Sequence, residues 1–315
     1  MDLSIIIINW NSKDYLRECV KSIPQGAKGL DYEILVIDNA SYDGVDQMIA
    51  TEFPHVAFIQ TERNLGFSAG NNHAARQAKG KVLLFLNPDT LVKEDALSEL
   101  VEALRRLPDA GIVGARLLNS DGTLQTCCVQ SFPTIASQVL GCEQFLRWFP
   151  HARLWGMAAL FDESPEPAAV EAVSGACLMV KSELFARLEG FDERYFMYSE
   201  DIDLCFRVRG AGLKCYYVPT ALVVHHGGGS SQNARNAFAN VMIRESVYRF
   251  MRLHRGRLRA VSFRLAMGLS ALCRLPFVAI LSPFRRGIHV GKSPIQKWLS
   301  IVRWSLGMEP WAAKH

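Results

Sequence analysis

Residues 83–90 read Leu-Leu-Phe-Leu-Asn-Pro-Asp-Thr, and this stretch decides the fold. The apolar run before Pro88 predicts a buried strand that stops at the proline, because proline cannot donate to a strand ladder. The carboxylate of Asp89 then lies just beyond the carboxyl end of that strand, where open α/β sheets bind their ligands. An aspartate at such a place is a natural ligand for a hard divalent cation that also binds phosphates. A solvent-exposed turn aspartate is the alternative, so the rest of the chain has to decide between the two.

Two earlier strands end in polar residues in the same way. Residues 3–8 are almost continuously β-branched and run into Asn9, and residues 33–37 run into Asp38. A helix with one apolar face separates them. Strand–helix–strand units of this length predict parallel pairing with right-handed crossovers. We therefore expect a mostly parallel sheet flanked by helices, an α/β fold, with Asp38 and Asp89 at one edge.

Two loops carry signals of function. Residues 63–72 predict a loop that runs into a helix, and its small residues let the backbone approach another group closely. That group is either a nucleotide sugar or a tightly packed helix, and spacing alone does not choose. Residues 125–167 have prolines and aromatics without a period, which predicts a long loop with short helices. Loops of that length are usually functional or mobile, so we expect this one to cover the site or touch a second substrate.

Acidic residues and a histidine add to the predicted site. Glu200, Asp201 and Asp203 open a helix, where the helix dipole favours acids whatever their function. A strand at 221–224 ends at His225 and brings a third polar group to the same edge of the sheet. No Gly-x-Gly-x-x-Gly follows the first strand and no Walker loop is present, so phosphates would be handled mainly by a metal. An aspartate with a histidine is a suitable pair for Mg²⁺ or Mn²⁺.

Charge is divided unevenly along the chain. Residues 244–315 contain 14 Lys and Arg against 2 Asp and Glu, a balance of +12, whereas the preceding 243 residues contain 21 and 29, a balance of −8. A basic tail suits an anionic partner, either nucleic acid or an anionic membrane face. Residues 260–284 are apolar, but arginines and prolines leave uncharged pieces well short of the roughly 20 residues that a spanning helix needs. We expect an amphipathic helix in the plane of a membrane surface, with a helical subdomain or an oligomer contact as the alternative.

Cysteine usage indicates the compartment. The 8 cysteines include no Cys-x-x-Cys pair and lie mostly among apolar residues, which predicts buried, reduced thiols. The first residues lack the length and the basic flank of a signal peptide. We therefore expect a cytosolic chain.

Six motifs occur in an order that resembles a known family. They are Ile-Ile-Ile-Ile-Asn-Trp-Asn at 5–11, Val-Ile-Asp-Asn-Ala-Ser at 36–41, Arg-Asn-Leu-Gly-Phe-Ser-Ala-Gly-Asn-Asn at 63–72, Leu-Asn-Pro-Asp-Thr at 86–90, Phe-Asp-Glu-Arg-Tyr-Phe-Met-Tyr-Ser-Glu-Asp-Ile-Asp-Leu-Cys-Phe-Arg at 191–207, and His-His-Gly-Gly-Gly-Ser at 225–230. Each motif alone has little specificity, but the ordered set is strongly specific. Over about residues 3–250 the chain resembles the inverting family-2 glycosyltransferases with a GT-A fold, particularly their rhamnosyltransferase-like branch.

The resemblance implies roles at the predicted edge of the sheet. Asp89 matches the retained ligand of the family's Asp-x-Asp metal motif. Asn87 replaces the first aspartate of that motif and is expected on the donor side. Asp201, the second residue of a Glu-Asp pair, matches the general base. His225 matches a histidine that can contact the metal, and His226 is a close competitor for that role.

The resemblance also implies a donor site and partners. Asn9, Asn11 and Asp38 resemble positions that hold the nucleotide base and ribose, and Asn64 and Gly66 match the donor-side loop. The implied cofactor is Mg²⁺ or Mn²⁺. The implied partners are a nucleotide-sugar donor and a saccharide or lipid-linked saccharide acceptor, with no nucleic acid.

The chemistry of such a transfer requires few groups. Breaking a sugar–phosphate bond leaves a nucleoside diphosphate whose developing charge a divalent cation stabilises. The acceptor hydroxyl has a pKa far above neutral, so a positioned carboxylate must take its proton. One base on the face opposite the leaving group gives a single displacement with inversion, unlike the carboxylate pair of a retaining glycosidase.

We therefore expect a GT-A domain over residues 1–232 and a basic amphipathic helical tail over residues 233–315. The expected reaction transfers L-rhamnose from dTDP-rhamnose to its acceptor in cell-surface polysaccharide synthesis, with the tail on the inner face of the cytoplasmic membrane. A UDP-hexose or UDP-galactofuranose donor is one alternative, and a non-catalytic scaffold that binds a nucleotide sugar is another. A sugar-phosphate nucleotidylyltransferase is a further alternative. Enzymes of that class resemble one another in a Gly-rich loop after the first strand, and this chain has Asn-Trp-Asn-Ser at 9–12 instead, which argues against it.

Overall fold

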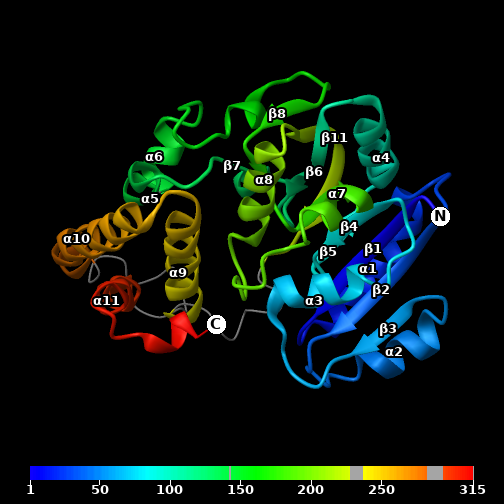
Figure 1. Cartoon of the computed structure of the whole chain (residues 1–315), viewed down its shortest axis with the longest axis horizontal. Coiled ribbons are helices and arrows are strands. Elements are labelled where there is room, and N and C mark those ends of the chain that lie inside the picture. The colour runs from blue at the N-terminus through cyan, green and yellow to red at the C-terminus, as the bar shows by residue number, and fades with distance from the viewer. Residues whose placement is uncertain (142, 228–236, 282–293, 315) are drawn as a thin grey trace. The chain divides into compact units, whose positions relative to one another are not determined.

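The computed structural model describes residues 1–141, 143–227, 237–281 and 294–314, which form two compact units (Figure 1). The first unit comprises residues 1–132, 150–196 and 200–230, and the second comprises residues 133–149, 197–199 and 231–315. The expected boundary between residues 232 and 233 lies outside the described residues and stays a prediction.

The first unit is built on one large mixed sheet. Among the described residues its nine strands are β1 (Leu3–Asn9), β2 (Tyr32–Asp38), β3 (Ala57–Gln60), β4 (Val82–Leu86), β5 (Thr90–Val92), β6 (Ala110–Leu118), β8 (Ala168–Val170), β10 (Cys177–Lys181) and β11 (Lys214–His225). Their order is β3-β2-β1-β4-β10-β6-β11-β5, with β8 paired to β11. Strands β3, β2, β1 and β4 are parallel, and β10 is antiparallel to both β4 and β6. The mostly parallel α/β sheet expected from the sequence is confirmed.

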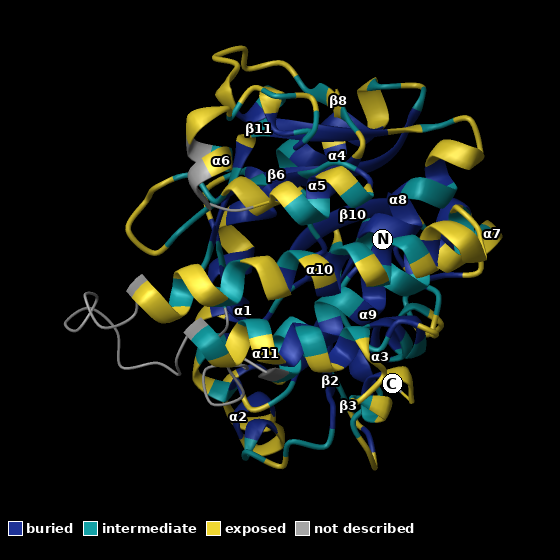
Figure 2. Ribbon diagram, turned by 90° about the vertical axis from the view of Figure 1, so that its left-hand side faces the viewer, coloured by how far each residue is buried: buried dark blue, intermediate teal, exposed yellow. Residues whose placement is uncertain are grey.

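Helices flank this sheet and bury its centre. They are α1 (Lys13–Gly26), α2 (Val45–Glu52), α3 (Gly66–Ala75), α4 (Ala96–Arg106), α7 (Ser182–Arg187) and α8 (Glu200–Gly210). A two-stranded pair, β7 (Val129–Gln130) with β9 (Ala172–Val173), and two short 3₁₀ turns, η1 (Thr126–Cys128) and η2 (Ala158–Phe161), complete the unit. Strands β1, β4 and β10 are buried almost throughout, and Figure 2 shows the middle of the sheet in the buried colour. Such continuous apolar runs are typical of strands covered on both faces.

The register of the strands gathers polar residues at one edge. Asn9 lies opposite Asp38 on β1 and β2, and Ile7 lies opposite Leu86 on β1 and β4. The ends of these strands are therefore level, and the turn after β4 begins beside the end of β1. Because β10 runs antiparallel, its first residue, Cys177, lies opposite Leu86, so the turn that precedes β10 reaches the same edge.

Strand β11 is longer than the strand predicted at 221–224. It is one strand over Lys214–His225, with a register shift between Val218 and Leu222 where it pairs with β6. The proline at 219 interrupts the apolar pattern, but a bulge accommodates it without ending the strand. The end of β11 pairs with the short strand β5, with His225 opposite Thr90. This pairing brings the histidine beside the Asp89 turn.

The second unit is helical. It contains α5 (Ile135–Leu140), α6 (Glu143–Trp148), α9 (Ala237–His254), α10 (Arg257–Leu281), α11 (Pro294–Ser305) and the 3₁₀ turn η4 (Pro310–Ala313). Helix α10 packs against α5, α9 and α11. Trp304 is fully buried, and its indole N–H donates to Glu245 Oε2 at 2.7 Å. Helices α5 and α6 are short helices of the kind predicted within the 125–167 stretch, and they belong to this unit.

Helix α10 continues through two arginines and one proline of the apolar stretch, whereas the second proline lies outside the described residues. It runs unbroken for 25 residues with Pro276 inside it. Among the described residues it is the one helix long and apolar enough to cross a membrane by length and composition, and 22% of its apolar window is buried within the protein. Length therefore does not by itself exclude a spanning helix.

Candidate active site

Asn9 and Asp38 form a buried polar pair at the ends of β1 and β2. Asn9 Nδ2 donates to Asp38 Oδ1 at 2.7 Å, and neither side chain is exposed. Asp38 also accepts hydrogen bonds from the Ser41 hydroxyl and from Gln60 Nε2. Burial alone raises the pKa of Asp38, but the hydrogen bonds from Ser41, Gln60 and Asn9 outweigh it and lower that pKa below its usual value. Asp38 is therefore an ionised carboxylate in a fixed orientation.

Gly66 is held by its neighbours at the start of α3. Asn64 Oδ1 accepts from the Gly66 N–H at 2.8 Å, and Asn39 Nδ2 donates to the Gly66 carbonyl at 3.0 Å. Its φ is +76°, and a Cβ there would lie 2.4 Å from the Phe196 carbonyl oxygen. The packing alternative left open by the sequence thus accounts for this glycine. Asn11, by contrast, is exposed beyond β1, with a φ of +52°.

Asn9 and two side chains near these groups present buried atoms with unmet hydrogen-bonding capacity. Within the part of the chain that the structure describes, Asn9 Oδ1, Asn39 Oδ1 and the Ser68 hydroxyl are buried without a hydrogen-bond partner. Buried polar atoms are almost always paired, so atoms of this kind require an explanation. They lie at or near the ends of β1 and β2 and in α3, the elements that carry Asn9, Asp38 and Gly66.

His225 meets the Asn87–Asp89 turn at the end of β11. His225 Nε2 lies 3.3 Å from Asp89 Oδ1 and 3.3 Å from Asn87 Nδ2. Asp89 is 5% exposed. His226 faces elsewhere, with its Nδ1 2.7 Å from the Ser120 hydroxyl and its ring 5.5 Å from that of Tyr15. The geometry thus favours His225 over His226 as the partner of Asp89.

Gln125 contacts His225 and was missed by the sequence analysis. Gln125 Oε1 lies 2.7 Å from His225 Nδ1, and Gln125 Nε2 donates to the His225 carbonyl at 3.0 Å. The two residues are 100 positions apart. The one available signal was the hairpin-type turn at 119–122, which returns the chain toward β11.

Asp201 occupies the first turn of α8. Its Oδ2 accepts from the Gly175 N–H at 2.8 Å and its Oδ1 from the Ile202 N–H at 2.8 Å, and the residue keeps partial exposure. Burial raises the pKa of Asp201, although these backbone donors oppose the shift. The neighbouring Glu200 is 7% exposed, and burial together with the charge of Asp201 raises its pKa well above the usual value. Asp201 is therefore the carboxylate of this pair that ionises first.

Asp203 on the same helix has a different environment. Its side chain is 1% exposed and accepts from Arg207 Nε at 2.7 Å. Arg207 also donates to the carbonyls of Leu188 and Gly190. These contacts tie α8 to the preceding loop, which is a structural role.

One short turn links the two halves of the site. Gly175 donates to Asp201, and the carbonyl of the next residue, Ala176, accepts from the Asn87 N–H at 3.0 Å. Adjacent residues of the 174–176 turn therefore contact the Asp201 carboxylate and the Asn87–Asp89 turn. The two predicted halves lie beside the same backbone segment.

The side chains that could bind a metal at this edge allow a test of the expected cofactor. Among the described residues no three His, Cys, Asp or Glu side chains gather into a metal site. Mg²⁺ commonly binds through one or two protein ligands together with substrate phosphates and water. One carboxylate and one imidazole, Asp89 and His225, with 3.3 Å between Oδ1 and Nε2, fit that pattern for Mg²⁺ or Mn²⁺.

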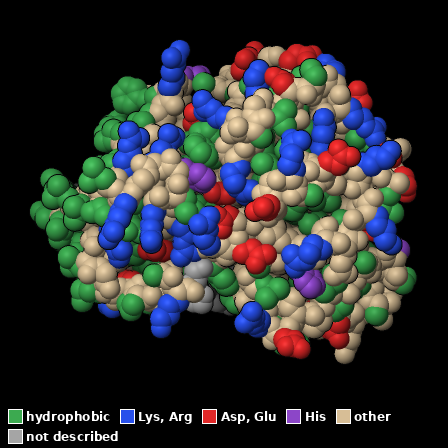
Figure 3. All heavy atoms as spheres, viewed as in Figure 1, with side chains coloured by type: hydrophobic (Ala, Val, Ile, Leu, Met, Phe, Trp, Pro, Cys, Tyr) green, Lys and Arg blue, Asp and Glu red, His purple; other side chains and the backbone are tan. Residues whose placement is uncertain are grey.

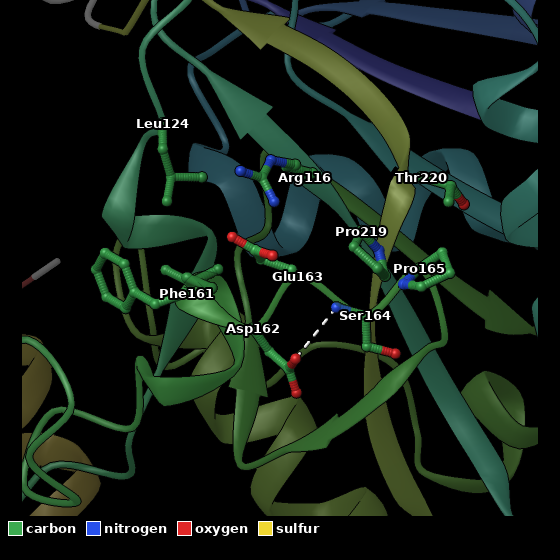
Figure 4. Close-up of a pocket in the computed structure, with 10 residues that line it drawn as sticks. Arg116, Leu124, Phe161, Asp162, Glu163, Ser164, Pro165, Pro219 and Thr220 are labelled. Carbon is green, nitrogen blue, oxygen red and sulfur yellow. Dashed lines mark hydrogen bonds between the residues drawn. The ribbon is translucent and has the colours of Figure 1, made fainter.

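A separate cavity of about 430 Å³ lies where β11 bulges from β6 (Figure 4). Arg116 and Glu163 extend into it in Figure 4, and Phe161 and Thr220 also line it. Arg116 donates to the Tyr217 hydroxyl at 3.2 Å. None of the residues that line this cavity belongs to the set predicted from the sequence.

Known proteins resemble both the sequence and the fold. Residues 4–147 match Glycosyl transferase family 2. The chain is 29% identical over 241 residues to N-acetylglucosaminyl-diphospho-decaprenol L-rhamnosyltransferase of Mycobacterium tuberculosis, covering 73% of this chain and 77% of that protein. It is 27% identical over 229 residues to rhamnosyltransferase WbbL of Escherichia coli, covering 70% and 82%.

A solved structure supports the fold. The mannosyltransferase PcManGT from Pyrobaculum calidifontis, in complex with GDP-Man and Mn²⁺, aligns with a TM-score of 0.58 over 99% of this chain and 85% of that one. Its sequence identity of 17% makes this a likeness of fold alone. With the strand-end site and the sequence relatives, it leads to one conclusion: the chain is a nucleotide-sugar glycosyltransferase with a GT-A-like fold, and its residues 4–147 match glycosyl transferase family 2.

Proposed function

We propose that this enzyme transfers L-rhamnose from dTDP-rhamnose, with inversion and with Mg²⁺ or Mn²⁺, to a saccharide or lipid-linked saccharide of a cell-surface polysaccharide. The observation that carries the mechanism is the 174–176 turn, which contacts Asp201 through Gly175 and Asn87 through Ala176. A base and a cation site beside one backbone segment suit a single displacement. The choice of rhamnose rests on the two rhamnosyltransferases among the relatives.

The Asn87–Asp89 turn would stabilise the leaving group of the reaction. Asp89 and His225 would hold the cation, and their separation of 3.3 Å supports that assignment. When bound, the cation supplies electrostatic stabilisation of the nucleoside diphosphate that leaves. The amide of Asn87, 3.3 Å from His225 Nε2, is placed to orient the histidine or a phosphate oxygen.

The ends of β1 and β2 and the 63–72 loop would bind the donor nucleotide. Asp38, held ionised by its hydrogen bonds, suits the hydroxyls of a ribose. The unpartnered oxygens of Asn9 and Asn39 suit donors on a nucleobase. Asn11 and Asn64 complete the proposed donor set, and Gly66 shapes its loop.

Asp201 would take the proton of the acceptor hydroxyl as that oxygen attacks the anomeric carbon. Its raised pKa, caused by burial, makes it a stronger base than an exposed aspartate. Glu200 gives up its proton less readily, because burial and the charge of Asp201 raise its pKa well above the usual value. A single base then serves the reaction.

Two variants separate donor binding from chemistry. Asp89→Ala should lose the Mn²⁺-dependent part of donor affinity, measured by calorimetry with and without Mn²⁺. Asp201→Asn should bind the donor as the wild type does and fail to transfer the sugar. Unchanged metal dependence in Asp89→Ala, or near-normal turnover in Asp201→Asn, would contradict the respective role.

The donor is tested by competition among nucleotide sugars. A preferred ligand raises the melting temperature by mass action, so dTDP-rhamnose with Mn²⁺ should stabilise the protein more than UDP-hexoses or UDP-galactofuranose do. A larger shift with a UDP sugar would replace rhamnose in the proposal. A non-catalytic scaffold would bind a nucleotide sugar without hydrolysing or transferring it, so a slow donor hydrolysis assay distinguishes that alternative.

The membrane part of the proposal rests on the surface of α10. One face is buried in the second unit through Ala260, Phe263, Met267 and Ala271. The opposite face exposes large apolar side chains, namely Leu258 (81%), Leu265 (65%), Leu269 (64%), Leu272 (53%), Phe277 (68%) and Ile280 (66%). We call these six residues the α10 ridge. In Figure 3 hydrophobic side chains gather over α10, with Lys and Arg side chains beside them.

The contacts of α10 favour a helix that lies in the membrane surface. Arg264 donates to the Trp304 carbonyl at 2.7 Å, and Arg274 donates to the Val139 carbonyl at 2.6 Å. Both arginines are thus held on the protein side along the helix. Exposed arginines at 252, 255, 257 and 259 lie before and at the start of the helix, where anionic headgroups would meet them. An apolar face with a basic border is the pattern of an interfacial helix.

Vesicle binding tests this surface. A double variant, Leu265→Glu and Leu269→Glu, should lose co-sedimentation with anionic phosphatidylglycerol vesicles, whereas Phe161→Glu, an equally drastic change on the first unit, should not. Release of the membrane-bound protein by alkaline carbonate would support in-plane binding. Resistance to carbonate would indicate a spanning helix, and a double variant that still binds would refute the role of the ridge.

A further inference from the structure

Gln125 contacts both the backbone and the ring of His225, at the site where the proposed function places a cation. We propose that Gln125 is a positioning residue that fixes the tautomer of His225 and directs its Nε2 lone pair toward Asp89. This inference rests on the proposed function for its purpose, whereas the tautomer itself can be tested without any metal.

The orientation of the Gln125 amide follows from its neighbours. One end of the amide lies 3.0 Å from the His225 carbonyl and 3.0 Å from Asn119 Oδ1, and both of these are acceptors. The amide nitrogen must therefore occupy that end, because only N–H groups can satisfy two acceptors. The oxygen Oε1 then faces His225 Nδ1 at 2.7 Å.

The tautomer of the histidine follows in turn. An amide oxygen can only accept, so Nδ1 must carry the hydrogen. In the neutral ring the other nitrogen, Nε2, then has no hydrogen and presents a lone pair. Histidines that bind metals commonly donate their second N–H to a carbonyl or carboxylate in this way.

The consequence is visible at the Nε2 side of the ring. Nε2 lies 3.3 Å from Asp89 Oδ1 and 3.3 Å from Asn87 Nδ2, so the lone pair that can accept from the Asn87 amide also faces a carboxylate oxygen. Two acceptors at that distance repel each other unless a positive charge lies between them. The pair that Gln125 creates is therefore a site that favours a cation.

The chain holds Gln125 firmly in this place. Its N–H donates to the Leu117 carbonyl at 2.9 Å, and Asn119 N–H donates to the Thr123 carbonyl at 2.7 Å, which closes a hairpin directly after β6. Asn119 Nδ2 also donates to the Thr123 hydroxyl at 2.9 Å, so the acceptor for Gln125 is itself fixed. The orientation of His225 is thus set by a rigid hairpin.

The first test reads the tautomer directly. Nitrogen NMR of the full chain carrying isotope-labelled histidine should show His225 with Nδ1 protonated and Nε2 unprotonated, with the signals assigned by their loss in His225→Ala. Gln125→Leu should abolish this preference. A wild-type ring protonated only at Nε2 would overturn the inference, whatever becomes of the proposed reaction.

The second test measures Mn²⁺ itself. Gln125→Leu should weaken Mn²⁺ binding, followed by the electron paramagnetic resonance of free Mn²⁺, by roughly 10–100-fold. Gln125→Glu keeps an acceptor for Nδ1 but loses the two N–H donations to the His225 carbonyl and Asn119 Oδ1, so its affinity should fall between those of the wild type and Gln125→Leu. Gln77→Leu is the matched control, because Gln77 also lies beside a histidine, with its Nε2 3.5 Å from His73 Nε2. Gln77 is exposed and is distant in sequence from Gln125 and His225. If Gln125→Leu binds Mn²⁺ as tightly as the wild type does, the inference is overturned. If the wild type shows the expected tautomer but binds no Mn²⁺, only the metal part of the proposed function is overturned.

Discussion

Replacing Asp201 with asparagine tests the catalytic part of the proposal most sharply. The variant keeps the shape of the side chain but cannot accept a proton. General bases contribute about 10²–10⁴-fold to rate, or about 3–5 kcal/mol of transition-state stabilisation. We therefore expect turnover to fall by that factor, with donor affinity unchanged because the proposal places Asp201 on the acceptor side.

The same substitution should change stability little. Asp201 accepts one backbone N–H at each oxygen, from Gly175 and from Ile202. An asparagine has one oxygen, so one of these donors loses its partner at a cost of about 1–3 kcal/mol. Removing a charge whose pKa is raised by burial offsets part of that cost. The melting temperature should fall by less than about 6 °C, since 1 kcal/mol shifts it by about 2–4 °C at this size.

Asp203→Asn is the matched control, because it makes the same change two residues further along the helix. It weakens the contact with Arg207, whose side chain is 23% exposed, and a broken buried ion pair costs about 3–5 kcal/mol. Partial exposure of Arg207 favours the lower end, so we expect a fall of roughly 6–12 °C with turnover retained where the protein is folded. Melting curves and initial rates on both variants decide the matter. Turnover above a tenth of wild type in Asp201→Asn, or equal losses in both, would refute the assignment.

The pH dependence of the wild type adds a check on Asp201. The base works only when ionised, so activity should fall as the pH drops through the pKa of Asp201, which burial raises above the usual aspartate value of roughly 4. For stability the sign is the reverse of a salt-bridged acid. The folded state disfavours the charge, so the contribution of Asp201 is most favourable below the unfolded pKa and is lost as pH rises through the folded one. An acid limb at or below the usual aspartate value would contradict this.

Three further changes follow from the rest of the site. Gly66→Ala places a Cβ 2.4 Å from the Phe196 carbonyl at a φ of +76°, so the melting temperature should fall by at least about 4 °C, and a neutral result in a thermal scan would contradict the packing. Asp38→Ala leaves the buried amide of Asn9 without its acceptor at a cost of about 1–3 kcal/mol, whereas the amide of Gln60, which is exposed, can turn to water. Because the folded pKa of Asp38 is lowered, that difference in unfolding free energy should be full above the unfolded pKa and fade as pH falls through the folded one. Removal of divalent ions with EDTA should abolish turnover and added Mn²⁺ should restore it, whereas full activity in EDTA would exclude a metal at Asp89.

The sequence predicted the strands whose signals are local. Strands β1, β2 and β4 are continuous apolar runs bounded by polar turns, so their positions and their parallel pairing could be inferred from residues next to one another. Strands β5 and β9 contain 3 and 2 residues, which is too short for any period to show. Helices α5 and α6 have 6 residues each, and only tertiary contacts assign them to the second unit.

The site residues also divide into those that the sequence could place and those that depend on distant parts of the chain. Asp38 and Asp89 could be placed at one edge because Asp38 ends β2 and Asp89 lies in the turn after β4, and the register brings the ends of these strands to the same edge. The sequence indicated that the backbone at Gly66 approaches another group closely. It could not identify that group, because Phe196 lies in a loop 130 positions further along the chain (196 − 66 = 130). Gln125 lay in the stretch whose sequence has no period, and its role depends on a histidine 100 positions further on.

The antiparallel strand β10 explains how the proposed base, which lies on a helix, is connected to residues at the strand ends. In a purely parallel sheet only carboxyl ends would reach this edge. Because β10 runs the other way between β4 and β6, the turn at its amino end arrives there instead, with Gly175 donating outward to Asp201 and Ala176 accepting from Asn87. Two consecutive residues of the backbone, Gly175 and Ala176, then set the spacing between the proposed base and the proposed cation site. The geometry of the proposed displacement is thus held by backbone, which side-chain substitutions elsewhere in the site leave in place.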